Sequence, residues 1–150
     1  MINTQTLAQH NQLYFDTVLA RPGVFEGFSI TTYTPIITNI IHSCNIRSVL
    51  DYGCGNAGAW KQHQLARLFR INELSLYDPS KPEYLNGRQC SDLVICIDVL
   101  EHIPEHLLEE VLIDIAKNTN KIIFLAISTR ESTKYLINGQ KTHQTVQPKS

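Results

Sequence analysis

Three aspartates in the sequence stand where a ligand site could form. Asp51, Asp78 and Asp98 each follow a short apolar stretch, and Gly53 and Gly55 come directly after the first of them. Glycine has no Cβ, so this turn leaves room for a ligand close to the backbone, although plain turns also use glycine pairs. A carboxylate can accept two hydrogen bonds side by side, which suits the hydroxyls of a ribose. No basic residue lies beside the glycine turn, so the three acids favour a positively charged ligand without a pyrophosphate.

Hydrophobic patterning predicts the elements that position these residues. Strands are expected over residues 48–52, 74–77, 93–97 and 121–127, and the last two have the apolar runs of strands buried on both faces. Helices are expected over residues 4–20, 34–44, 57 to about 69, and from Pro104 onward, with a small hairpin around Asn138–Gly139. This alternation predicts an α/β fold with a mostly parallel sheet and helices on both faces. Ligands bind such sheets at the carboxyl ends of the strands, where the three aspartates should meet.

Two of these helices carry apolar residues at helical spacing. The first stripe is Ile36, Ile37, Ile40, Ile41 and Cys44, and the second is Leu107, Leu108, Val111, Leu112 and Ile115. Thr34 is predicted to cap the first of the two helices. Both helices should therefore lie against the sheet.

Size and composition limit the classes of protein to consider. The 150 residues suffice for one domain over 1–150, the net charge is −1, and there is no basic run of the kind that binds nucleic acid. No window approaches the ~20 apolar residues of a membrane span, and the amino terminus lacks the pattern of a signal peptide, so a cytoplasmic location is expected. No Cys-x-x-Cys pair occurs, so neither a zinc site nor a disulfide framework is predicted for Cys44, Cys54, Cys90 and Cys96.

Three motifs resemble those of the class I S-adenosylmethionine-dependent methyltransferases. They read Val-Leu-Asp-Tyr-Gly-Cys-Gly (49–55), Leu-Tyr-Asp-Pro (76–79) and Asp-Leu-Val-Ile-Cys-Ile-Asp-Val-Leu-Glu-His-Ile-Pro (92–104). The third motif is the most specific, and the resemblance covers about residues 48–130. It is closest to small stand-alone methyltransferases of bacteria and their phages. The resemblance implies a Rossmann-like methyltransferase fold and S-adenosyl-L-methionine as the cofactor.

The resemblance also implies roles for individual residues. Those expected at the methionine end of the cofactor are Asp51, Tyr52, Gly53 and Gly55. Those expected at the ribose and adenine are Asp78 and Pro79, and those beside the departing methyl group are Asp98 and Val99. A general base is needed only if the acceptor atom must lose a proton early, and the candidates are His102 and then His143. A hydrogen bond to nearby backbone is the alternative role of His102, and the one that the sequence favours.

A metal site and an aromatic lid are two weaker interpretations. Asp98, Glu101 and His102 fall at i, i+3 and i+4, and some methyltransferases with a similar motif hold magnesium in this way. The sequence instead favours a solvated or capping role for Glu101, and no metal is predicted. The aromatic residues that could close over the cofactor, or simply belong to the core, are Tyr14, Phe25, Phe28 and Tyr33.

The chain departs from the family pattern in ways that suggest a reduced fold. Ala57 replaces the usual third glycine of the turn, and only 14 positions separate Asp78 from Asp92, too few for the helix and strand that the family inserts there. The chain also ends after one hairpin, where two more strands are usual. The sequence therefore predicts fewer strands and an exposed sheet edge, through which the chain could self-associate.

The predicted function is methyl transfer to a small-molecule acceptor. Val-Leu-Glu follows Asp98, in place of the Pro-Pro-aromatic turn of enzymes that methylate base amino groups, so a nucleic-acid acceptor is disfavoured. The alternative is a module that binds the cofactor but has lost transferase activity. A nicotinamide-dependent oxidoreductase is less favoured, because no catalytic pairing is evident.

Overall fold

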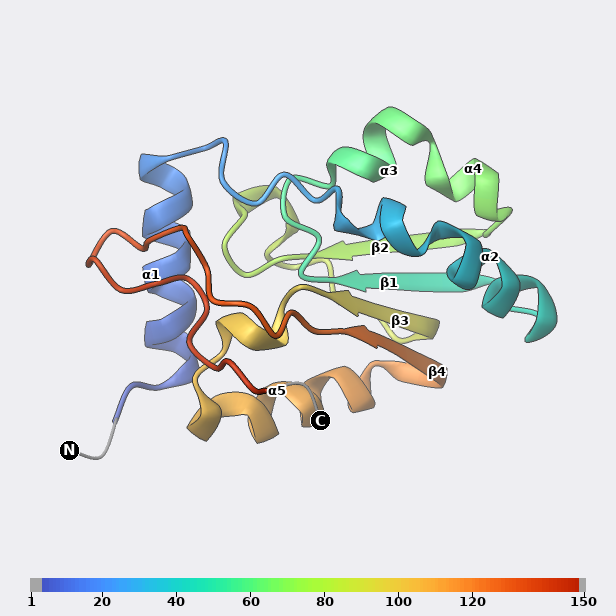
Figure 1. Cartoon of the computed structure of the whole chain (residues 1–150). Coiled ribbons are helices and arrows are strands. Elements are labelled where there is room, and N and C mark those ends of the chain that lie inside the picture. Colours follow the sequence, from blue (N-terminus) through green and yellow to red (C-terminus); the bar gives the residue numbers. More distant parts are fainter. Residues whose placement is uncertain (1–3, 149–150) are drawn as a thin grey trace.

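Four parallel strands form the sheet in the computed structural model, which describes residues 4–148. The strands are β1 (Ser48–Tyr52), β2 (Glu73–Tyr77), β3 (Ser91–Ile97) and β4 (Thr119–Ala126). Their order is β2-β1-β3-β4, and every neighbouring pair is parallel. The carboxyl ends of all four strands consequently lie at the same end of the sheet, as the arrowheads in Figure 1 show.

Helices cover both faces of this sheet. The helix α2 (Thr34–Ser43), with α3 (Gly58–His63) and α4 (Leu65–Phe69), lies on one face, and α5 (Leu108–Lys117) lies on the other (Figure 1). The helix α1 (Leu7–Ala20) lies beyond the carboxyl ends of the strands (Figure 1). Short 3-10 turns are η1 (Ser29–Tyr33), η2 (Pro82–Tyr84), η3 (Leu100–His102) and η4 (Glu105–Leu107). The predicted α/β architecture with helices on both faces is confirmed.

Each face of the sheet has its own apolar core. On one face, Ile37 of α2 and Phe69 of α4 are fully buried against strand residues such as Val49. On the other face, Val111 and Ile115 of α5 are buried in a second cluster. Burying such side chains contributes about 1.5–3 kcal/mol each. The sheet is therefore held rigidly from both sides, which fixes the positions of its strand ends.

The structure corrects several predicted elements. The helix expected over 57–69 is divided into α3 and α4 at Gln64, which adopts a left-handed conformation with φ 48°. Thr34 is not a cap, because Tyr33 occupies that position and Thr34 already belongs to α2. The helix after Pro104 begins with η4, and α5 starts at Leu108. The predicted hairpin is reduced to one bridge, between Tyr135 and Lys141.

Two predicted apolar stripes are also only partly buried. Ile36 is 54% exposed and Leu112 is 42% exposed, because both lie at the margin of the buried face of their helix. Cys44 is exposed because α2 ends at the residue before it. The prediction that β4 is buried is wrong. Its alternate residues Ile123 and Leu125 are about two-fifths exposed, because β4 lies at the edge of the sheet. The predicted exposed edge is therefore present.

No helix among residues 4–148 is both long enough and apolar enough to cross a bilayer.

Candidate functional site

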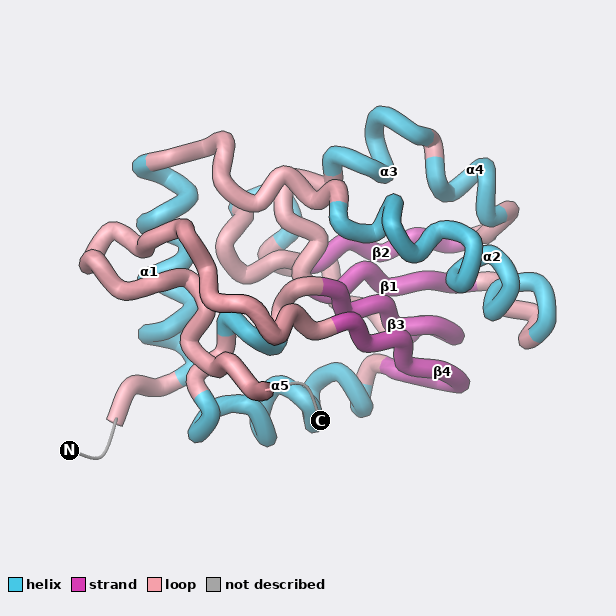
Figure 2. The backbone as a smooth tube through the Cα atoms, viewed as in Figure 1, coloured by secondary structure: helices cyan, strands magenta, loops and turns pink. Residues whose placement is uncertain are grey.

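A cavity of about 520 Å³ lies at the carboxyl ends of β1 and β3. Its lining comes from the turns after these two strands, from residues 25–30 and from the C-terminal residues 128–143. Figure 2 shows the loops gathered at this end of the sheet. The cavity is therefore assembled from segments far apart in the sequence, and the rigid strand ends provide its base.

The glycine turn needs glycine at both positions. Gly53 has φ 89° and Gly55 has φ 57°, a left-handed region that other residues avoid. A Cβ on Gly53 would overlap the side chain of Val99, and one on Gly55 would overlap the carbonyl oxygen of Phe25. Both glycines line the cavity. The third position of the turn, Ala57, also has a positive φ of 53°, so alanine is accommodated there at some cost in strain.

Asp51 lies at the base of the cavity and is 8% exposed. One of its oxygens, Oδ2, accepts a 2.6 Å hydrogen bond from Nε1 of Trp60. The pKa of the Asp51 carboxyl is raised to about 7, chiefly by burial; the hydrogen bond from Trp60 opposes the rise and the nearby charge of Asp78 adds to it. A cation bound beside Asp51 would favour its charged form.

Asp78 holds the glycine turn from the end of β2. Its Oδ2 accepts a 2.8 Å hydrogen bond from the amide of Gly55, and its Oδ1 accepts bonds from the amide and hydroxyl of Ser80 at 2.8 and 2.6 Å. A carboxylate has about four lone-pair sites, so one remains on Oδ2 for a ligand hydroxyl. Asp78 is therefore a structural anchor as well as a candidate ligand contact.

A second, smaller cavity of about 90 Å³ adjoins the first. Asp78, Pro79 and Val99 line it, and Gly53 and Asp98 line both cavities. Asp98 has φ 53°, a conformation that aspartate tolerates better than most residues, and its amide donates to the carbonyl of Ala126 at 2.9 Å. Asp98 is thereby fixed at the junction of the two cavities.

The structure places one predicted cofactor residue elsewhere. The side chain of Tyr52 points to the opposite face of the sheet, where its ring packs on Tyr77 and its hydroxyl donates a 2.7 Å hydrogen bond to Asp114. Successive side chains of a strand alternate between faces, so Tyr52 and its neighbour Asp51 cannot line the same pocket with their side chains.

His102 has the backbone hydrogen bond that its sequence context favoured. Its Nδ1 lies 2.8 Å from the carbonyl oxygen of Thr142, and because a carbonyl only accepts, this nitrogen carries the proton. Burial lowers the pKa of the His102 imidazole to about 4. The ring is therefore neutral at physiological pH and a weak base.

His143 is brought against His102 by the C-terminal segment. The two ring centroids are 4.8 Å apart and the ring planes are nearly perpendicular, at 89°. The Nδ1 atom of His143 lies 2.6 Å from the carbonyl oxygen of Arg130 and is therefore also the protonated nitrogen. The sequence contained no signal for this pairing, because it depends on how residues 128–143 cross the strand ends.

Glu101 is the residue whose predicted role is wrong. It is 1% exposed rather than solvated, and its Oε1 accepts a 3.0 Å hydrogen bond from the amide of Ser128. Its Oε2 is buried without a hydrogen-bond partner. Burial raises the pKa of the Glu101 carboxyl. The ligand atoms of Glu101, His102 and His143 all lie within 4.8 Å of one another, so His143 takes the place that sequence spacing gave to Asp98.

Three of the four aromatic lid candidates lie at the site: Phe25 and Phe28 line the larger cavity, and Tyr14 and Phe25 line the smaller one. The rings of Tyr14 and Phe25 stack with centroids 5.8 Å apart, and both contact the ring of His102. The Tyr14 hydroxyl donates to the carbonyl of Thr142, so α1 is tied to the C-terminal segment. Tyr33, in contrast, packs on the sheet against Phe124. The pair Tyr14 and Phe25 therefore covers the smaller cavity.

Comparisons with known proteins found no match among family models, curated proteins or solved structures.

Proposed function

We propose that the chain binds S-adenosyl-L-methionine and transfers its methyl group to a small-molecule acceptor. The observation that carries the proposal is the meeting of two cavities at Gly53 and Asp98, with a further strand-end acid in each. Asp51 lines the larger cavity and Asp78 the smaller. This division suits a ligand with an amino-acid end and a nucleoside end, joined by a positively charged sulfur.

The residues present fit each end of that cofactor. Asp51 offers a buried carboxylate to the ammonium of the methionine end, and the glycine turn leaves space that a Cβ would fill. Asp78 offers its free lone pair to a ribose hydroxyl. The smaller cavity, at about 90 Å³, must widen to take an adenosine, so Tyr14 and Phe25 must move when it binds. These features, together with the three sequence motifs, support a methyltransferase form of the fold.

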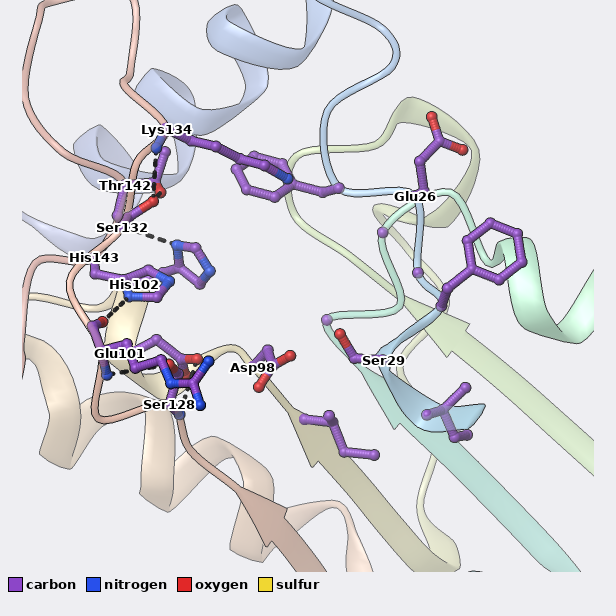
Figure 3. Close-up of a pocket in the computed structure, with 18 of the residues that line it drawn as sticks. Glu26, Ser29, Asp98, Glu101, His102, Ser128, Ser132, Lys134, Thr142 and His143 are labelled. Carbon is purple, nitrogen blue, oxygen red and sulfur yellow. Dashed lines mark hydrogen bonds between the residues drawn. The ribbon is translucent and has the colours of Figure 1, made fainter. Parts of the chain in front are cut away.

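The cofactor supplies an already activated methyl group, so the chain's contribution is orientation and exclusion of water. Ser29 lies on one wall of the larger cavity, and Glu101, His102 and His143 lie on the other, with Asp98 between them (Figure 3). We assign the wall of Glu101, His102 and His143 to the acceptor. His102, neutral and already bonded at Nδ1, can accept a proton only at Nε2.

The second candidate is a module that binds the cofactor without transfer. The low pKa of His102 favours it, because the first candidate for a general base is then a weak one. Incubating the purified chain and a cell extract with isotopically labelled S-adenosyl-L-methionine separates the two candidates. Label in any extract component, dependent on the chain, supports the transferase, whereas binding without label transfer supports the module.

Asp78→Ala tests the ribose assignment. We expect the affinity for the demethylated cofactor, S-adenosyl-L-homocysteine, to fall by about tenfold or more in calorimetry, which is about 1.4 kcal/mol. The matched control is Asp92→Ala, which removes a carboxylate at the opposite end of β3. Circular dichroism establishes whether each variant is folded. An unchanged affinity in folded Asp78→Ala protein would show that the assignment is wrong.

The exposed edge of β4 supports a further proposal, that two copies associate there. Ile123 and Leu125 alternate along β4 and are both about two-fifths exposed. Light scattering at micromolar concentration should give the mass of a dimer, and Ile123→Lys should give that of a monomer, because a buried lysine disfavours edge pairing. A monomeric mass for the unaltered chain contradicts this proposal and leaves the methyltransferase proposal untouched.

A further inference from the structure

We propose that Glu101, His102 and His143 bind one divalent transition-metal ion on the wall of the larger cavity. Figure 3 shows the three side chains together on that wall, and their ligand atoms all lie within 4.8 Å of one another. Metal–ligand distances of about 2.0–2.2 Å place neighbouring ligand atoms roughly 3 Å apart, so the side chains need to close by no more than about 2 Å.

The unpaired oxygen of Glu101 is the strongest sign of a cation. Among the described residues, its Oε2 is the one buried side-chain nitrogen or oxygen atom without a hydrogen-bond partner. A buried polar atom left in this state costs free energy that a folded protein normally avoids. The other oxygen, Oε1, is fixed by the amide of Ser128, so the carboxylate is oriented with Oε2 free. A metal ion at this position supplies the missing partner.

The two histidines are oriented as metal ligands are. His102 donates from Nδ1 to Thr142, and His143 donates from Nδ1 to Arg130. Each ring therefore keeps an unprotonated Nε2, which is the atom that binds a metal. Metal-binding histidines almost always donate their other ring N–H to a carbonyl or carboxylate, which fixes the tautomer and the ring orientation. Both rings have this second contact before any ion is bound.

Backbone contacts hold the C-terminal ligand in place. The carbonyl of Glu101 accepts hydrogen bonds from the amides of Gln144 and Thr145 at 2.8 and 3.0 Å, and the Thr145 hydroxyl donates to the carbonyl of Ile103 at 2.7 Å. These bonds tie the segment that carries His143 directly to the turn that carries Glu101. The cluster is therefore built by the fold, not by a chance approach of exposed side chains.

The ligand set indicates which ions the site takes. Two imidazoles and one carboxylate suit Zn²⁺, Fe²⁺ or Co²⁺, whereas Mg²⁺ prefers a shell of oxygens. Three protein ligands leave open positions for water or another ligand. If the proposed function also holds, an acceptor hydroxyl at such a position would lose its proton more readily. The metal site itself does not depend on that function.

Metal binding is measured on the full chain, prepared without a histidine tag and treated with a chelator. We expect titration with Co²⁺, followed by visible absorption, to give one ion per chain, and Zn²⁺ to displace it. Glu101→Gln and His143→Ala should each weaken Co²⁺ binding by about a hundredfold or more, because each removes one of three protein ligands. His42→Ala, which removes an exposed histidine on α2, is the matched control and should bind as the unaltered chain does.

Thermal melting gives a second readout, because the expected order of melting temperatures differs without and with metal. Without metal, Glu101→Gln should melt no lower than the unaltered chain, because it replaces a buried carboxylate by a neutral amide whose oxygen can still accept the bond from Ser128. With Zn²⁺, only the unaltered chain and the His42→Ala control should melt at a higher temperature, since an ion that binds only the folded state stabilises it. If Co²⁺ does not bind, or if it binds equally well to Glu101→Gln and His143→Ala proteins, the proposal is overturned. Neither result bears on S-adenosyl-L-homocysteine binding, so the proposed function is tested separately.

Discussion

Replacing Gly55 with alanine should destabilise the chain by roughly 2–5 kcal/mol and abolish cofactor binding. The left-handed φ of 57° costs an alanine about 1–2 kcal/mol, and overlap of the new Cβ with the carbonyl oxygen of Phe25 adds about 1–3 kcal/mol for overpacking. Any shift of the turn also weakens the 2.8 Å bond from the Gly55 amide to Asp78. Urea denaturation measures the change in the free energy of unfolding, and calorimetry with S-adenosyl-L-homocysteine measures binding.

Gly139→Ala separates backbone strain from overlap. Gly139 also has a positive φ, 84°, but no atom lies within 4 Å of the position that its Cβ would take. This variant should therefore lose only the strain contribution, about 1–2 kcal/mol, and bind the cofactor normally. Equal destabilisation by the two substitutions would mean that the close approach of the Phe25 loop to the turn does not exist in solution.

The architecture could be predicted because its signals are local. The apolar run of β3 is long, and all but one of its residues are buried, as such a run requires. Three parallel strands that each end in an acid bring these acids to the same end of the sheet. The location of the site therefore followed from the strand assignments. The need for glycine at 53 and 55 was also visible, because glycine is the residue that accepts such turns without strain.

The rest depended on contacts between distant segments. No residue type near Gln64 predicts the break between α3 and α4, which comes with the left-handed conformation of Gln64, and Phe69 of α4 is fully buried. Glu101 was expected in solvent because acids usually are, but residues 128–145 cross over it and bury it. The position of His143 follows from the same crossing. The i, i+3, i+4 spacing grouped Asp98 with Glu101 and His102, because such spacing relates only residues that are close in sequence. It could not indicate His143, which is distant in sequence from the other two.

Raising the pH should destabilise the chain through Asp51. The pKa of this carboxyl is about 7 in the folded chain because of burial, against 3.8 for an ordinary aspartate. The protonated form is therefore favoured by folding, so the stabilisation is complete below about pH 4 and is lost as the pH rises through about 7. A difference of about three pH units corresponds to about 4 kcal/mol. Urea denaturation at about pH 4 and pH 8 should show a fall of this order, relative to the Asp51→Asn variant, whose amide oxygen can still accept the bond from Trp60.

Cofactor binding should favour the charged form of Asp51, which burial disfavours in the unliganded chain. At about pH 6 most unliganded chains carry a proton on Asp51, and a cationic ligand beside it favours the charged carboxylate, so binding releases up to about one proton. Calorimetry with S-adenosyl-L-homocysteine in two buffers of different protonation enthalpy measures that number. The affinity should rise toward about tenfold per pH unit below pH 7, and Asp51→Asn should remove both the rise and the proton release. Tight binding without proton release would place the ammonium of the ligand away from Asp51, and the assignment of the methionine end to the larger cavity would then be wrong.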